Sequence, residues 1–215
     1  MLHINDLTYR IEGRPLLEQA TAMIAEGWIV GFTGRNGTGK STLFKLIREE
    51  ISPDDGAISV NPGRRIGSVA QEAPATNDSL LETVLQADQE RASLLLRAET
   101  ETDPDEIASI QTRLADIEAH SAEARAATVL AGLGFDDEQQ KRACQEFSGG
   151  WRMRVALAGV LFAKPDLLLL DEPTNYLDLE GAVWLENYIK RYPYTAIIIS
   201  HDRELLNRSV SHILS

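Results

Sequence analysis

Eight consecutive residues, 34–41, restrict what this chain can fold into more than any other feature of its sequence. They read Gly-Arg-Asn-Gly-Thr-Gly-Lys-Ser and fit the pattern G-x-x-x-x-G-K-[ST]. The motif follows the apolar run Trp28 to Thr33 and precedes Lys40 to Ile51, whose leucines and isoleucine recur at helical spacing. In that context the backbone N–H groups can surround phosphate oxygens at the N-terminus of a helix. The sequence therefore predicts a phosphate-binding loop between a strand and a helix.

The loop predicts which side chains meet the phosphates and a divalent cation. Lys40 is expected to reach the outer phosphates, and the hydroxyl of Ser41 is expected to ligate Mg²⁺. The other residues expected to bind nucleotide here are Gly34, Arg35, Asn36, Gly37, Thr38, Gly39 and Thr42.

Two adjacent carboxylates close the apolar run Leu167 to Leu170. Asp171 and Glu172 should emerge at the carboxyl edge of a sheet, where open α/β sheets bind their ligands. Asp171 can hold Mg²⁺ through water, and Glu172 can polarise an attacking water. An ordinary acidic pair at the end of a strand is the alternative, and the phosphate-binding loop upstream makes that alternative the weaker one.

Three further sites are ambiguous by residue type alone. His201 follows the β-branched run Thr195 to Ile199 and could bond a terminal phosphate, although a structural histidine is the commoner case. Gln71 closes the predicted strand Arg65 to Ala70 and could equally be an exposed loop amide. Ser148-Gly-Gly, at the start of a helix, offers a hydroxyl and backbone N–H groups to an anion, or is simply a flexible N-cap.

Short apolar runs alternate with helical segments in the first and last thirds of the chain. Strands that are apolar on both faces and separated by helices predict an α/β fold whose mostly parallel sheet is covered on both sides. The predicted strands are Leu2 to Arg10, Trp28 to Thr33, Ala57 to Val60, Arg65 to Ala70, Leu167 to Leu170 and Thr195 to Ile199, and the predicted helices are Lys40 to Ile51, Val155 to Phe162 and Ala182 to Lys190.

The stretch from about Leu80 to Gly132 is helical in pattern. One helix is predicted to carry Leu81, Val84, Leu85, Leu95 and Leu96 on a single face. A second is predicted to begin at Pro104 and to carry a heptad seam of Ile107, Ile110, Leu114 and Ile117. The two helices should form an antiparallel hairpin with an acidic tip at residues 99–105.

Composition excludes several classes of protein. The 215 residues include one cysteine and four scattered histidines, so neither an internal disulfide nor a zinc cluster is expected. The longest apolar stretch, Val155 to Ala163, is about half of what spans a bilayer, and the N-terminus lacks a signal pattern. The net charge is −12, and residues 82–146, with 15 acidic and 6 basic side chains, hold most of it. We therefore expect a cytoplasmic protein whose helical part does not attract nucleic acid by bulk charge.

Taken in order, the motifs resemble those of an ABC-type ATPase domain. The resemblance rests on residues 34–41, Gln71, Ser148-Gly-Gly, Asp171-Glu172, Asn175 to Asp178 and His201, and it covers nearly the whole chain. It implies a P-loop NTPase fold of the ABC type with a small antiparallel β region and an inserted α-helical subdomain. It also implies ATP and Mg²⁺ as cofactors and a second ABC domain as partner.

The resemblance implies a role for each matched residue. Glu172 resembles the catalytic glutamate, His201 the switch histidine, and Gln71 the glutamine that touches metal and water; the implied metal set is Ser41, Gln71 and Asp171. Ser148, Gly149 and Gly150 resemble the signature that contacts ATP held by the second domain, and Asp178 lies in a segment that resembles the D-loop. Tyr9 is placed to stack on adenine, although an aromatic residue in a first strand is more often part of the core.

Two departures from a transporter-type domain narrow the resemblance. The signature continues with Trp151 where transporters usually have glutamine, and residues 71–148 are longer and carry the hairpin. Both features resemble the ABC-F proteins, and the residues around Gly132-Leu-Gly-Phe resemble their YheS-like branch. The implied function is ATP-driven closure of paired ABC domains on the ribosome, in translation, without membrane insertion or direct DNA binding. The first alternative is the nucleotide-binding subunit of an ABC transporter. The second is a DNA-repair or chromosome-associated ABC ATPase, a class that usually shows a much longer coiled coil or a cysteine-rich zinc insertion.

These expectations fix a domain plan for the chain. Residues 1–215 are interpreted as one ABC domain, a fragment of a two-domain protein, with weak ATPase activity on its own. Its nucleotide-binding core is expected at residues 1–72 and 146–215, and the helical subdomain with its arm-like hairpin at residues 73–145.

Overall fold

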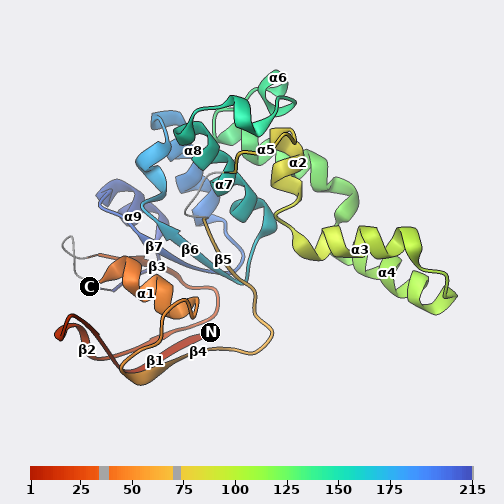
Figure 1. The fold of residues 1–215 in the computed structure, drawn as a ribbon. Helices are drawn as coiled ribbons and strands as arrows, with labels where there is room; N and C mark the ends of the chain where they lie inside the picture. Colours follow the sequence, from red (N-terminus) through yellow and green to blue (C-terminus); the bar gives the residue numbers. More distant parts are fainter. Residues whose placement is uncertain (34–38, 70–73, 215) are drawn as a thin grey trace. The chain divides into compact units, whose positions relative to one another are not determined.

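The structure is a computed structural model that describes residues 1–33, 39–69 and 74–214 (Figure 1). The chain forms two compact units. The first comprises Met1–Ser68, Lys164–Asn175 and Ala182–Ser215, and the second comprises Val69–Ala163 and Tyr176–Gly181.

A five-stranded parallel sheet forms the centre of the first unit. Its order is β5 (Ile66–Ser68), β6 (Leu167–Asp171), β7 (Thr195–Ile199), β3 (Ile29–Phe32) and β8 (His212–Leu214). Each neighbouring pair runs parallel, and every residue of β7 is buried. The parallel sheet predicted from the apolar runs is confirmed.

A smaller antiparallel sheet belongs to the same unit. In it β1 (Leu2–Ile11) pairs with both β2 (Arg14–Ile24) and β4 (Asp55–Val60). β2 was not predicted, because its alternation of exposed and half-buried side chains includes alanines and only one β-branched residue before Ile24. The two-residue turn Glu12–Gly13, with positive φ at both positions, joins β1 to β2 in the manner of a tight hairpin.

Helix α1 (Lys40–Ile47) fills the space between the two sheets (Figure 1). Its apolar side chains join a single core cluster with residues from both sheets. The helix ends before the predicted Ile51, since Glu49 adopts a left-handed φ of 59° that an α-helix cannot continue through. The buried members of the cluster are Met1, Leu2, Ile4, Leu7, Ile24, Val30, Leu43, Phe44, Leu46, Ile47, Leu167, Leu169, Ile197 and Ile199.

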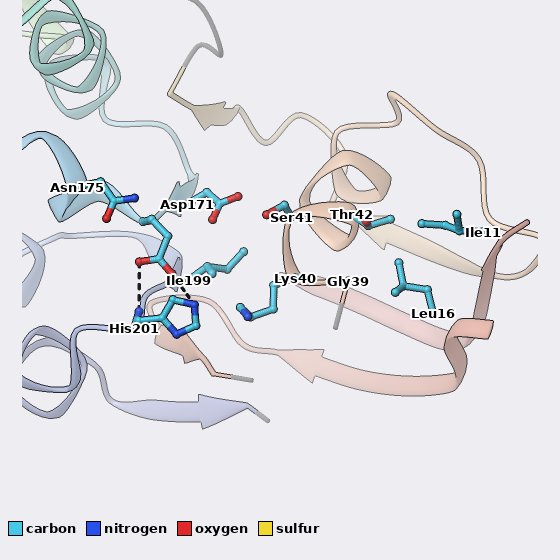
Figure 2. Close-up of a pocket in the computed structure, with 11 residues that line it drawn as sticks. Ile11, Leu16, Gly39, Lys40, Ser41, Thr42, Asp171, Asn175, Ile199 and His201 are labelled. Carbon is cyan, nitrogen blue, oxygen red and sulfur yellow. Dashed lines mark hydrogen bonds and ion pairs between the residues drawn. The ribbon is translucent and has the colours of Figure 1, made fainter. Parts of the chain in front are cut away.

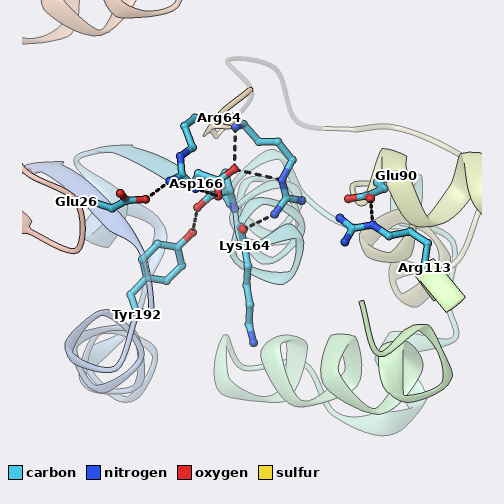
Figure 3. Close-up of polar contacts among 9 residues, drawn as sticks. Glu26, Arg64, Glu90, Arg113, Lys164, Asp166 and Tyr192 are labelled. Atoms are coloured by element: carbon cyan, nitrogen blue, oxygen red, sulfur yellow. Dashed lines mark hydrogen bonds and ion pairs between the residues drawn. The ribbon is translucent and has the colours of Figure 1, made fainter. Parts of the chain in front are cut away.

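Polar contacts fix the starts of β5 and β6 (Figure 3). The backbone N–H of Arg65 donates to Asp166 Oδ2 at 2.8 Å, and Arg64 lies within ion-pair distance of both Asp166 and Glu26. The hydroxyl of Tyr192 donates to the carbonyl of Pro165 at 2.5 Å, and burial raises the pKa of this phenol. These bonds hold the register in which Ile66 pairs with Leu167.

Helices make up the second unit. α2 (Leu80–Leu85), α5 (Ala122–Gly132) and α7 (Gly149–Ala163) pack on one another, and the short α6 (Asp137–Gln140) follows α5. α7 packs against α2 and α5 and so belongs to this compact unit. α8 (Leu179–Lys190) begins in this unit, but from Ala182 onward it belongs to the first unit, as does α9 (Arg203–Ser209).

The predicted hairpin is present as α3 (Gln89–Thr100) and α4 (Pro104–Asp116) (Figure 1). Its antiparallel register is marked by two ion pairs, Glu90 with Arg113 at 2.6 Å (Figure 3) and Arg97 with Glu106 at 3.0 Å. Ile110 and Leu114 of the predicted seam are buried against Leu94. No helix among the described residues is both long enough and apolar enough to cross a membrane.

The prediction of one continuous helix before the hairpin turn was wrong. The helix is interrupted between α2 and α3, where the side chain of Asp88 accepts the N–H of Arg91 and caps a new helix. The interruption rotates the second segment, so that Leu94 rather than Leu95 and Leu96 faces α4, and Leu96 is 65% exposed.

Gly56 should be the least replaceable glycine of the antiparallel sheet. Its φ is +79°, and a Cβ at this position would lie 2.4 Å from the backbone oxygen of Asp6. Gly63 is a matched control, because its φ is +76° but a Cβ there meets nothing within 4 Å. We expect Gly63→Ala to lower the free energy of unfolding by about 1–2 kcal/mol and Gly56→Ala to lower it by about 2 kcal/mol more, measured by urea unfolding. Equal losses would contradict the close approach.

Candidate nucleotide-binding site

Three adjacent strands carry the predicted site residues to one edge of the parallel sheet. β7 lies between β3 and β6, and its last residue, Ile199, pairs with Phe32 on one side and with Asp171 on the other. The chain leaves β3 toward the phosphate-binding motif, leaves β6 at Glu172, and leaves β7 toward His201. Three segments far apart in sequence therefore end in one row.

A pocket of about 590 Å³ opens at this edge (Figure 2). The start of α1 forms one wall with Gly39, Lys40, Ser41 and Thr42, and the ends of β6 and β7 form another with Asp171, Glu172, Asn175, Ile199 and His201. Ile11 and Leu16 also line the pocket. The structure thus brings together Lys40, Ser41, Asp171, Glu172 and His201, as their motifs predict.

The start of α1 is suited to an anion. Gly39 stands at the N-cap with φ 87° and offers no side chain to the first N–H groups of the helix, and the first turn contains no acidic residue. The partial positive charge of a helix N-terminus favours phosphate. Lys40, in the first turn, is buried and lines the pocket.

Ser41 and Asp171 provide oxygen ligands on opposite walls of the pocket. Figure 2 shows the Ser41 hydroxyl and the Asp171 carboxylate turned toward each other. A hydroxyl and an exposed carboxylate are the hard oxygen donors that Mg²⁺ prefers when it keeps several waters and binds substrate phosphates. The donor set therefore fits a magnesium ion.

Glu172 and His201 form a close pair beside this donor set (Figure 2). The backbone N–H of His201 donates to Glu172 Oε2 at 3.2 Å, and His201 Nε2 lies 3.4 Å from Oε1. Oε1 is buried and accepts no hydrogen bond from the described residues. A buried oxygen that lacks a donor costs free energy, so this carboxylate is ready to accept a bond from a water in the pocket.

The backbone of Glu172 is strained. Its φ is +46°, a region that non-glycine residues rarely occupy, and its N–H donates to the carbonyl of Ile199 at 2.8 Å. Such conformations cost of order 1–3 kcal/mol and concentrate at functional sites.

The signature-like segment opens helix α7 in the second unit. Ser148 precedes the helix, and its carbonyl accepts the N–H of Arg152 at 2.9 Å. A Cβ at Gly149 or Gly150 would meet nothing within 4 Å, so the backbone of this first turn is open to an approaching group.

Arg154 connects the signature helix to the segment that contains Asp178. Its guanidinium lies over the ring of Trp151 at 4.2 Å and donates to the carbonyls of Tyr176 and Leu133 and to Asp178 Oδ2 at 3.0 Å. The N–H of Gly181 and Arg154 together lower the pKa of Asp178 from its ordinary 3.8. Because the folded-state pKa is the lower one, this stabilisation is complete above about pH 4 and is lost as the pH falls through the lowered value.

Of the remaining expected residues, only Tyr9 is among those that the structure describes. Tyr9 packs against the core cluster of the first unit and is not among the residues that line the pocket. Gln71 and residues Gly34, Arg35, Asn36, Gly37 and Thr38 lie outside the described residues. Sequence reasoning missed Ile11 and Leu16 as lining residues; the signal available was their position around the Glu12–Gly13 turn of an unpredicted hairpin.

The phosphate-binding helix, the parallel sheet with its carboxylate edge and the helical unit formed by the intervening sequence define an ATP-binding domain of the ABC type. The model of the ABC transporter family matches residues 17–175, and the chain belongs to this family. The predicted fold class is confirmed, and the chain is an ABC-type ATP-binding domain.

Relatives with curated names extend this assignment. The chain is 45% identical over 217 residues to the probable ATP-binding protein YheS of Escherichia coli strain K12, covering 100% of this chain and 34% of that protein. It is 42% identical over 212 residues to ATP-binding cassette sub-family F member 3 of Homo sapiens, covering 94% of this chain and 29% of that protein. The chain therefore spans about a third of the length of these relatives.

Solved structures share the fold at lower identity. An ATP-binding subunit of an ABC transporter aligns with a TM-score of 0.74 at 21% identity, covering 100% of this chain and 85% of that chain. The ATP-binding cassette MJ0796, solved as a post-hydrolysis dimer bound to ADP and Pi, aligns with a TM-score of 0.69 at 21% identity, covering 97% of this chain and 91% of that one.

Removing the Arg154 side chain should weaken the attachment of α7 to the segments around Leu133 and Asp178 and so lower the stability of the fold. Arg154→Met removes the donor to two backbone carbonyls and to Asp178 Oδ2, and we expect a loss of about 2–4 kcal/mol in the free energy of unfolding. Arg142→Met is the matched control, since Arg142 is about half exposed and pairs with Glu146 at the surface, where an ion pair contributes about 1 kcal/mol or less. Urea unfolding followed by circular dichroism gives both values. A loss at Arg154 no larger than that at Arg142 would contradict the connecting role.

Proposed function

We propose that this chain is the ATP-hydrolysing ABC domain of an ABC-F type protein that acts on the ribosome in translation. The buried Glu172 carboxylate oxygen without a donor, between His201 and the Ser41–Asp171 ligand pair, supports hydrolysis. The α3–α4 hairpin and Trp151, together with the sub-family F relatives, support the ABC-F assignment. The absence of a membrane-spanning helix from the described part of the chain is compatible with a cytoplasmic protein that acts without membrane insertion.

Hydrolysis follows from the side chains around the pocket. Lys40 and the N-terminus of α1 bind the phosphates and offset their negative charge. Ser41, with Asp171 through water, would hold Mg²⁺, which supplies charge stabilisation to the phosphoryl oxygens when bound. Glu172 accepts a hydrogen bond from the attacking water through Oε1 and orients it, and His201 holds Glu172 in place and faces the terminal phosphate. Gln71 is assigned to the same water and metal by its motif.

A second ABC domain completes the site in this proposal. Ser148, Gly149 and Gly150 would contact the terminal phosphate of ATP held by the second domain, and Asp178 would meet the partner at the same interface. The open first turn of α7 and the fixed position of Asp178 support this assignment. Direct binding to DNA is not part of the proposal, because acidic side chains dominate the helical unit.

The need for a second domain predicts a concentration dependence. This chain alone should bind ATP but turn it over weakly, and its specific activity should rise with protein concentration as transient pairs of chains form. Phosphate release measured across about a hundredfold range of concentration tests this. A specific activity that is high and constant over that range would contradict the paired site.

The whole protein that carries this domain should bind ribosomes when hydrolysis is blocked. Glu172→Gln keeps the size of the side chain and its contact with His201 but removes the carboxylate charge, so ATP binding should persist while turnover falls by about a hundredfold or more. We expect this variant to cosediment with ribosomes in ATP and not in ADP. Lys40→Ala, which removes the phosphate contact, is the control that should not cosediment. Recovery of the Glu172→Gln protein in membranes instead would favour a transporter subunit.

A further inference from the structure

Two aromatic rings flank the signature-like segment, residues 148–150, and pack on a third ring. Phe147 lies directly before Ser148, and Trp151 lies three residues after it. The centroids of Phe147 and Phe135 are 5.8 Å apart at an interplanar angle of 82°, and those of Trp151 and Phe135 are 5.1 Å apart at 64°. Phe135 is only 1% exposed. One buried ring therefore anchors both ends of an exposed segment.

We propose that Phe135, Phe147 and Trp151 form an aromatic clamp that positions the signature-like segment for ATP held by the second ABC domain. The three rings are positioning residues, because they act through Ser148 and the backbone of the two glycines that follow it. The inference rests on the proposed pairing of two ABC domains and deepens it. It assigns part of the rate of turnover to side chains that do not line the nucleotide pocket.

The end of helix α5 fixes the position of Phe135. The N–H of Phe135 donates to the carbonyl of Leu130 at 3.1 Å. The N–H of Gly134 donates to the carbonyl of Ala131 at 3.1 Å, and Gly134 has a φ of +96°. These two bonds with a left-handed glycine form the Schellman ending of a helix, which sets the direction of the chain that leaves it. Phe135 is therefore held by a hydrogen-bonded helix end.

Two further contacts hold Trp151. The guanidinium of Arg154, one turn along α7, lies over the indole ring at 4.2 Å. A Cβ at Gly134 would lie 3.8 Å from Trp151 Cζ3 and 3.0 Å from Arg154 Nη1, so a larger residue there would press on Arg154. A glutamine, the usual residue at this position in transporter-type domains, has no ring for these contacts. Trp151 therefore supplies packing that glutamine cannot.

The signature-like segment needs this support because its own residues supply little. A Cβ at Gly149 or Gly150 would meet nothing within 4 Å, and Ser148 is exposed. Glycine loses more conformational freedom on ordering than any other residue. A displacement of about 1 Å in a group that positions a substrate can cost about a hundredfold in rate. Rings anchored on both sides restrict the positions that the Ser148 hydroxyl can occupy.

Turnover by pairs of chains tests the clamp. At a fixed high concentration of this chain, we expect Trp151→Gln to lower the rate of phosphate release by about tenfold or more. Trp151→Phe keeps a ring against Phe135 and should stay within about threefold of the wild-type rate. The dissociation constant of ATP for the single chain should change by about twofold or less in both variants, because the clamp lies outside the pocket lining. Equal turnover by Trp151→Gln and the wild-type chain would overturn the proposal.

A control with a similar loss of stability separates positioning from general destabilisation. Val84 of α2 is 0% exposed in the same helical unit. α2 is followed by Ala87, which meets α7 at Gly159, where a Cβ would lie 3.1 Å from the Cβ of Ala87. Val84→Ala should lower the urea midpoint, because it leaves a cavity, yet keep turnover within about twofold of the wild-type rate. Turnover that falls with the urea midpoint alike in Val84→Ala and Trp151→Gln would contradict the positioning role.

A double-variant cycle tests whether the clamp acts through the signature-like segment. Ser148→Ala removes the hydroxyl proposed to contact the terminal phosphate and should slow turnover by pairs about tenfold or more. Residues that act as one unit have effects that do not add. Trp151→Gln should therefore slow turnover much less in the Ser148→Ala chain than in the chain that keeps Ser148. Effects that multiply in full would contradict action through this segment.

The concentration dependence of turnover distinguishes failure of this inference from failure of the proposed function. A wild-type chain whose specific activity does not rise with concentration would contradict the paired site, and the clamp with it. A wild-type chain that shows the rise, together with a Trp151→Gln chain that follows the same curve, would leave the paired site standing and contradict only the clamp. We expect the wild-type and Trp151→Phe chains to show the rise and the curve of Trp151→Gln to lie about tenfold lower.

Discussion

The pairing of β7 with both of its neighbours is the constraint on which the nucleotide site depends. Ile199 is bonded in register to β3 on one side and to β6 on the other, so the phosphate-binding loop, the acidic pair and His201 all start from one row of residues. A shift of one residue in either pairing would turn alternate side chains to the opposite face of the sheet. Apart from Asp171, the last residue of β6, these strands are almost wholly apolar, so the hydrogen bonds between them decide where the polar groups of the site lie.

The sequence predicted this part of the molecule well, for a physical reason. β3, β6 and β7 are buried on both faces, so each appears as an uninterrupted apolar run, and the residues that follow each run must reach the same edge. The start of α4 could be predicted equally well, because Asp103 caps the helix and Pro104 is a proline in its first turn.

Features that depend on tertiary packing could not be predicted in the same way. β2 has few strand-forming residues. It is stabilised by its hydrogen bonds to β1 and by packing against the core cluster that contains the apolar side chains of α1. The break between α2 and α3 depends on a single capping bond at Asp88. Tyr9 was the residue expected near the base, but it packs against the core cluster, and Ile11 lines the pocket instead. Arg154 looks like an ordinary helical arginine until its partners in two distant segments are known.

The left-handed backbone at Glu172 sets stability and activity against each other at one position. Glycine adopts that φ without strain, so selection for thermal stability alone would favour replacing the carboxylate that we propose orients the attacking water. In this proposal, a glutamate persists there only while hydrolysis is under selection. Residue 172 would therefore be an early position to change in a copy of this domain that had kept nucleotide binding and lost turnover.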